Sequence, residues 1–395
     1  MNNLSSLKAL TNIVPYSKLS SFPLGEYKRK VIETKYQYKS NIFSFSEDNY
    51  DFILSMLLQS AARQESLIII DPERKLFSGT KRFFKDKNYS IYRFSTEKSK
   101  EYDGINNSYN LWEKANTSNN IRLAAECVVS TFLYTHMLDD NEAIKDAAIA
   151  LLSAVMSYTV TFALLKSNKF SFAYELMKTN TLEQLKLKLQ DVNDTTDLFL
   201  EETKMQDKDM QAYAYETLKE MFRLLSKKEN NELLSMSDFE PDIISSFKSA
   251  TFFEYAQNKS FDISIDILLF ITFYANFKRQ EAVKGRSQAI NVVLNKPEML
   301  NSLDMIDSMI ALARKYKVNF FVSCNDSDIF TSSFEAIKKR FPYILIRKPL
   351  DLKNNLDITT RFTSPSDEIL ISANTQLNCK KYDASSHDLY ELFYR

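Results

Sequence analysis

Apolar and polar stretches alternate along the first hundred residues in the way expected of an α/β domain. The residues from 66 to 70 form a continuous apolar run that ends at Asp71, which is typical of a buried parallel strand. The same reading predicts, in order, a strand at 41–45, a helix at 50–63, the strand at 66–70, a helix at 78–87 and a strand at 89–94. This alternation indicates a doubly wound, mostly parallel sheet with helices on both faces, a three-layer αβα arrangement.

The pattern changes to long amphipathic helices with almost no Pro or Gly from about residue 118 to residue 234. Afterwards, strand patterns return at 251–255, 289–294, 319–323, 343–347 and 368–372, with helices at 262–277 and 303–316. We therefore predict an N-terminal arm over residues 1–40, an α/β domain formed by 41–110 and 245–395, and an inserted all-α domain over 111–244.

Composition and net charge do not indicate a class of binding partner. Lysine and arginine number 51 and so do aspartate and glutamate, so no net field draws the chain to nucleic acid or to a membrane. Three widely spaced cysteines argue against a disulfide framework, and two histidines argue against a His-based metal site. The first thirty residues lack a signal-peptide pattern, and the longest apolar runs, such as 147–156, are shorter than a membrane helix of roughly 20 residues. We expect a cytoplasmic protein without a transmembrane segment.

Glycine is scarce, and this scarcity bears on function. The chain has four glycines, and no two of them lie within ten residues of each other. Phosphate-binding loops need glycines so that the backbone can turn tightly and bring its N–H groups to the phosphates. The sequence therefore excludes an ordinary P-loop or dinucleotide fingerprint.

Four segments carry a resemblance to a known family. Residues 71–75 read Asp-Pro-Glu-Arg-Lys after a buried strand, residues 291–296 form a strand ending in Asn-Lys, residues 310–314 belong to a helix, and residues 381–390 contain Lys-Tyr-Asp, His and Tyr. In this order they resemble the type IV secretion coupling proteins, the conjugative DNA-transfer ATPases, in particular those of Gram-positive mobile elements. The resemblance implies a RecA-like P-loop NTPase fold with an inserted all-α domain.

The resemblance also locates the phosphate-binding loop, and its residues have changed. Counting back from Asp71 without gaps places the family's Gly-x-Gly-Lys-Thr segment on residues 48–52. Asp48 and Tyr50 then stand at glycine positions, and Asp51 replaces the lysine that neutralises phosphate. Phe52 replaces the hydroxyl that holds magnesium. All these changes oppose phosphate binding.

The Walker B positions have changed in the same direction. Asn295 stands at the metal-binding aspartate and Lys296 at the glutamate that would activate water, and a lysine ammonium cannot accept a proton. The family's glutamine after the next strand falls near Asn325. Arg314 is kept relative to the family, and either contacts a neighbouring subunit or caps its helix with its charge.

Two positions leave alternatives open. Asp71 lies where open α/β sheets bind ligands, but an aspartate before proline also commonly ends a strand. Glu73 and Lys75 invert the two charges of the family motif. Asp51 and Lys296 could form an ion pair across adjacent strand ends, in place of phosphate and metal.

The resulting hypothesis is a pseudo-ATPase without catalytic residues, bound metal or cofactor. It would work with protein components of a conjugation or secretion machine, as a scaffold or regulator, and assemble with itself or with an active paralogue. Family members usually carry N-terminal membrane helices, so membrane recruitment here would depend on a partner. Two alternatives remain: a divergent active translocase that uses ATP and Mg²⁺, and a DNA-binding protein without nucleotide chemistry.

Overall fold

The computed structural model falls into two compact units. One comprises residues 1–92, 242–253 and 276–395, and the other 93–241 and 254–275. The predicted domain boundaries differ from this division, because residues 93–110 and 254–275 group with the helical segments. The structure is described for residues 11–15, 19–35, 40–46, 50–96, 105–135, 142–163, 169–255, 263–283, 287–296, 309–311, 313, 315–326, 334–347, 367–372 and 375–393.

The described strands form one twelve-stranded sheet in the order β1-β3-β2-β12-β11-β10-β4-β9-β8-β5-β7-β6. Strands β10, β4, β9, β8, β5 and β7 pair in parallel, whereas β11, β12 and β1–β3 pair antiparallel. The predicted mostly parallel α/β fold is therefore confirmed. The bounds are β1 Thr11–Val14, β2 Pro23–Tyr27, β3 Lys30–Thr34, β4 Ile42–Phe45, β5 Ser66–Ile70, β6 Ser90–Ser95, β7 Ser249–Glu254, β8 Ile290–Asn295, β9 Val318–Cys324, β10 Tyr343–Ile346, β11 Asp367–Ser372 and β12 Thr375–Lys380.

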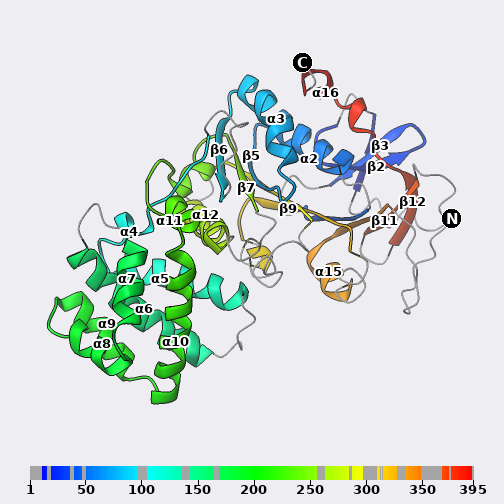
Figure 1. Cartoon of the computed structure of the whole chain (residues 1–395). Coiled ribbons are helices and arrows are strands. Elements are labelled where there is room, and N and C mark those ends of the chain that lie inside the picture. Colours follow the sequence, from blue (N-terminus) through cyan, green and yellow to red (C-terminus); the bar gives the residue numbers. More distant parts are fainter. Residues whose placement is uncertain are drawn as a thin grey trace. The chain divides into compact units, whose positions relative to one another are not determined.

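Helices cover the parallel strands on both faces. The central strands β5, β8 and β9 are buried along their whole length, which explains their continuous apolar runs. Helices α2 (Tyr50–Ala62) and α3 (Lys75–Asp86) lie together on one face, and α15 (Phe334–Arg340) lies on the other (Figure 1). The buried core of this unit is therefore two apolar layers, one on each side of the sheet.

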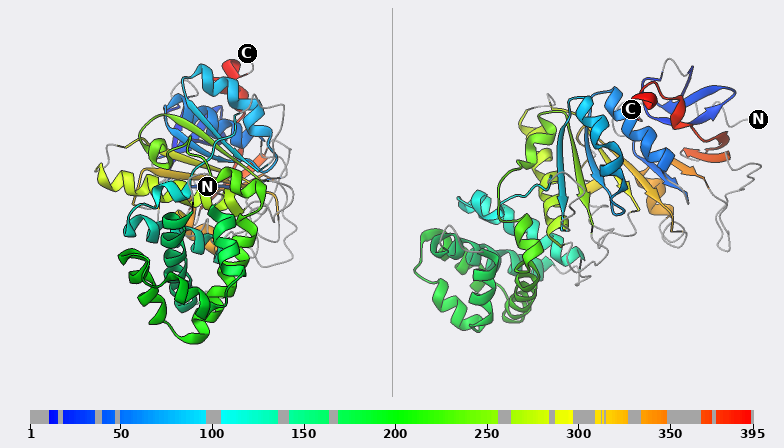
Figure 2. Two further views of the ribbon diagram at one scale, coloured as in Figure 1. Left: turned by 60° about the vertical axis from the view of Figure 1, so that its left-hand side comes forward. Right: turned by 45° about the horizontal axis from the view of Figure 1, so that its top comes forward.

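The predicted N-terminal arm contributes three strands to the sheet. Strands β1–β3 lie beside β11 and β12, which are more than 300 residues away along the chain (Figure 2). A Cβ at Gly25 would lie 2.9 Å from Cys379 Sγ and from Lys380 O, and closer still to the Glu368 carboxylate. Gly25 therefore permits the close packing of β2 against β12.

The second unit is largely helical. Polar side chains cap four of its helices: Asn110 caps α4, Thr181 and Gln184 form a capping box at α8, and Asn193 and Asp207 cap α9 and α10. The unit contains α4 Leu111–Lys114, α5 Ser118–Thr135, α6 Glu142–Phe162, α7 Lys169–Lys178, α8 Leu182–Leu189, α9 Asp194–Lys204, α10 Lys208–Leu225, α11 Lys228–Leu233 and the first part of α12 (Ile263–Ala282).

Helix α6 is the one described helix that is long and apolar enough to cross a membrane, by length and composition. It packs against α5, α9 and α10, and most of its apolar stretch is buried among them. In this setting α6 is the central helix of the helical unit.

A buried ion pair joins β6 and β7 in the second unit. Arg93 donates to both carboxylate oxygens of Glu254, at 3.0 and 2.6 Å, and to the carbonyl oxygen of Ile105 at 3.0 Å. The two charged side chains are only 3% and 0% exposed. A pair that is fully removed from water in this way depends on both partners being present.

Two asparagines cover the outer edge of β6. The Oδ1 atoms of Asn107 and Asn106 accept the N–H groups of Arg93 and Ser95, each at 2.9 Å. In return, the Asn107 N–H donates to Arg93 O at 2.7 Å and Asn106 Nδ2 to Ser95 O at 3.0 Å. Four main-chain groups on the free side of the last strand thus have partners within the chain.

The C-terminal segment docks on α2 through His387. This segment includes the short helices η5 (Ala384–Ser386) and α16 (Tyr390–Phe393). The Leu389 N–H donates to His387 Nδ1 at 3.1 Å, so Nε2 carries the proton and donates to Gln59 Oε1 at 2.9 Å. Burial lowers the pKa of His387 to about 4. The histidine of the terminal motif therefore has a structural role.

We expect His387 to make the protein less stable in acid. Its pKa rises from about 4 in the folded chain to about 6.5 when unfolded, so the unfolded state binds more protons in this range. Stability should therefore fall as pH falls from about 6.5 to about 4, by up to about 3 kcal/mol. The measurement is urea unfolding across this range for the wild type and for His387→Gln. The expectation is wrong if the two chains lose stability in parallel.

Candidate functional site

One edge of the sheet collects most of the predicted site residues. Strand β8 pairs in parallel with β5 and β9, and β9 pairs with β4, so their carboxyl ends share this edge. Such an edge is where open α/β sheets bind ligands. The described residues here are Tyr50, Asp51 and Phe52 at the start of α2, Asp71 after β5, Asn295 and Lys296 at the end of β8, and Asn325 after β9.

Asp71 caps helix α3. Its buried Oδ2 accepts the N–H groups of Leu76 and Phe77 at 2.8 and 3.0 Å, in the first turn of the helix. Arg74 precedes the helix in a left-handed conformation, with φ of 59°, and provides no side-chain cap of its own. The carboxylate that follows β5 is therefore engaged in satisfying helix N–H groups that would otherwise lack partners.

Lys296 forms an ion pair with Glu73, whereas the sequence suggested Asp51 as its partner. Lys75 reaches the other Glu73 oxygen at 3.4 Å. The hydrogen bond from Lys296 is the main reason why the pKa of Glu73 lies below its usual value, since burial acts in the opposite direction. Lys296 itself has a left-handed backbone, with φ of 53°, and its N–H donates to Ser323 O at 2.8 Å. The ends of β5 and β8 are thus linked by charge.

Phe52 is fully buried beneath a second ion pair. The Arg347 guanidinium lies 5.3 Å from the centre of its ring, and Arg347 Nε donates to Glu368 Oε2 at 2.6 Å. Burial raises the pKa of Glu368 to about 7, because desolvation outweighs the attraction of Arg347. The sequence reasoning missed both residues. An arginine at the end of one apolar strand and a glutamate inside another were the available signals.

The remaining predicted site residues differ in how far they are exposed to solvent. Asp51 is exposed in the first turn of α2, where a negative charge is favourable. Asn295 is buried, and Asn325 is half-buried. Asp48 and Arg314 lie outside the described residues. In the part of the chain that the structure describes, no three His, Cys, Asp or Glu side chains are grouped as metal ligands.

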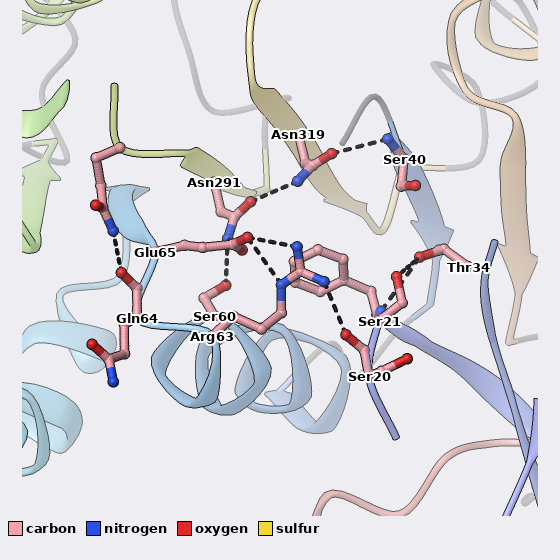
Figure 3. Close-up of polar contacts among 12 residues, drawn as sticks. Ser20, Ser21, Thr34, Ser40, Ser60, Arg63, Gln64, Glu65, Asn291 and Asn319 are labelled. Carbon is pink, nitrogen blue, oxygen red and sulfur yellow. Dashed lines mark hydrogen bonds and ion pairs between the residues drawn. The ribbon is translucent and has the colours of Figure 1, made fainter. Parts of the chain in front are cut away.

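A second polar cluster lies at the opposite, amino ends of the strands (Figure 3). Asn291 Nδ2 donates to Glu65 Oε2 at 2.7 Å and to Ser60 Oγ at 2.9 Å, and its Oδ1 accepts from Asn319 at 2.8 Å. Arg63 Nη2 pairs with Glu65 Oε1 at 2.6 Å. These side chains are buried and bonded to one another, which favours a role in stability. The signal in the sequence was an asparagine as the second residue of two apolar strands.

Comparisons with known proteins identify the fold. No protein-family model matches the chain, and none of the curated proteins matches its sequence. The conjugative coupling protein TrwBΔN70, solved unbound in a monoclinic form, superposes with a TM-score of 0.64 at 10% identity, over 92% of this chain and 88% of that chain. The chain has the fold of TrwB. VirB4 of Thermoanaerobacter pseudethanolicus superposes with a TM-score of 0.57 at 14% identity, over 95% of this chain and 98% of that chain.

TrwB has also been solved with ADP and Mg²⁺, and that structure superposes with a TM-score of 0.56 at 10% identity, over 88% of this chain and 79% of that chain. In this chain, side chains at the carboxyl edge of the sheet have partners within the chain. Phe52 offers no oxygen to a metal, Asp71 is engaged by α3, and Lys296 repels a cation. The fold is shared with TrwB.

Proposed function

We propose that this chain is a coupling-protein-like component of a conjugative DNA-transfer or type IV secretion machine that acts without hydrolysing ATP. The observation that carries the proposal is the Lys296–Glu73 ion pair at the carboxyl edge of the sheet. A nucleotide-hydrolysing site needs a metal-binding carboxylate and a proton acceptor near the phosphates. Here a lysine stands in this place, and its counter-ion is a glutamate of the same chain.

The role that remains for such a chain is to bind other proteins. The fold shared with TrwB and with VirB4 supports a place in a machine of this kind. The chain would act as a scaffold or regulator in the cytoplasm, next to an active paralogue or in an assembly of its own copies.

The test is the thermal stability of the purified chain with and without ATP and Mg²⁺. A ligand at 100 times its dissociation constant adds about 2.7 kcal/mol to the stability of the native state, which is readily seen as a higher melting temperature. We expect no change beyond that caused by Mg²⁺ alone or by ATP alone. A rise that needs both together would contradict the proposal and favour a divergent active nucleotide-dependent enzyme.

A further inference from the structure

Lys296 is held as a cation at a defined place on the sheet edge. Its left-handed backbone is unfavourable for a residue with a side chain, and it is fixed by the N–H hydrogen bond to Ser323. The side chain is only 22% exposed, so its ammonium is partly removed from water. A cation in this setting needs an anion close to it, because solvent no longer compensates its charge fully.

Glu73 supplies that anion from the turn between β5 and α3. One carboxylate oxygen contacts Lys296 and the other lies 3.4 Å from Lys75. The neighbouring carboxylate, Asp71, takes up two N–H groups of α3. Among the described residues at this point of the edge, Glu73 is therefore the anion for Lys296 and Lys75. Asp71 accepts the N–H groups at the start of α3.

We propose that Glu73 is an internal substitute for a bound oxyanion. Its carboxylate occupies the position next to Lys296 and Lys75 that a phosphate-type anion would take, and it keeps that position closed in the native chain. The inference rests on the proposed function, because it names what fills the edge of a sheet that has lost nucleotide chemistry. Removing the charge of Glu73 while keeping its size should take from both ammonium groups the counter-ion that the described residues give them and uncover a site for phosphate oxygens.

The experiment is calorimetric titration of Glu73→Gln with inorganic tripolyphosphate, without Mg²⁺ and at low ionic strength. We expect this variant to bind at least about tenfold more tightly than the wild type, and added salt to weaken the binding. The double variant Glu73→Gln with Lys296→Met should lose the gain. Glu335→Gln is the matched control, since it removes one charge from an ion pair with Lys338 elsewhere in the same unit.

The proposal is overturned if Glu73→Gln melts as a folded protein and binds tripolyphosphate no better than the wild type or Glu335→Gln. It is also overturned if the gain persists in the double variant, because the bound anion would then not contact Lys296. Glu73→Ala is a second neutral variant and has to behave in the same way. Failure of the proposed function is separate, since it would appear as Mg²⁺-dependent ATP stabilisation of the wild-type chain.

Discussion

Replacing Glu254 with glutamine is expected to lower the free energy of unfolding by about 3–5 kcal/mol. The substitution keeps the shape of the side chain but leaves the Arg93 guanidinium buried beside a neutral group. The two charge-assisted hydrogen bonds from Arg93 would be replaced by weaker ones, at most one of which an amide oxygen can accept well. The measurement is the shift of the urea unfolding midpoint, followed by circular dichroism.

Two comparisons isolate the buried charge as the cause. Glu202→Gln removes a partner of Arg122 from an exposed pair, with side chains 46% and 32% exposed, and should cost less than about 1 kcal/mol. Arg93→Met combined with Glu254→Met removes both charges and should recover much of the loss. If Glu254→Gln and Glu202→Gln lower the free energy of unfolding equally, the buried pair contributes no more to stability than the exposed pair.

Replacing Glu65 with leucine should destabilise the sheet unit by a similar amount, about 3–5 kcal/mol. Glu65 accepts from Arg63 through one oxygen and from Asn291 through the other, so both donors lose a buried partner (Figure 3). The loss should extend to the N-terminal strands. Arg63 also donates to Ser20 O at 3.0 Å and lies over the ring of Phe22, so its position helps to hold β2.

Urea unfolding and amide hydrogen exchange together test this prediction. The exchange of residues 20–34 should become faster in Glu65→Leu under conditions where α2 remains protected. Glu335→Leu is the control, because it also introduces leucine for a glutamate of an ion pair but at an exposed site. Unchanged protection of residues 20–34 would show that the N-terminal strands do not depend on the Arg63–Glu65 pair.

The central strands and helices could be predicted because burial on both faces leaves a signal in the local sequence. Strands β5, β8 and β9 are continuous apolar runs, and the predicted bounds agree with the structure within about two residues. Strands β1–β3 and β12 were missed. They carry polar residues and gain their partners from distant segments, as in the pairing of Glu26 with Lys380. No local pattern reports such a pairing.

The candidate site shows the same limit at the level of side chains. That Asp71 and Lys296 lie at the carboxyl edge follows from where their strands end. The partner of Lys296 could not be read from the sequence, because Asp51 and Glu73 both follow strands that end at this edge. The Arg347–Glu368 pair joins two strands whose antiparallel pairing had not been predicted. Which charged side chains pair with each other thus depends on how distant segments come together in the fold, and the local sequence does not show this.

The asparagines along β6 decide how molecules of this protein can meet. A bare last strand attracts a strand of another molecule, and this is how many β-sheet proteins aggregate when concentrated. Here the carboxamide groups of Asn106 and Asn107 imitate such a strand and occupy its bonding positions. Replacing both with alanine would expose the N–H groups of Arg93 and Ser95 and the carbonyl oxygen of Ser95, whereas the main-chain N–H of residue 107 would still reach Arg93 O. Copies that meet at β6 therefore have to recognise each other through side chains, because the sheet cannot readily be extended by a further strand there.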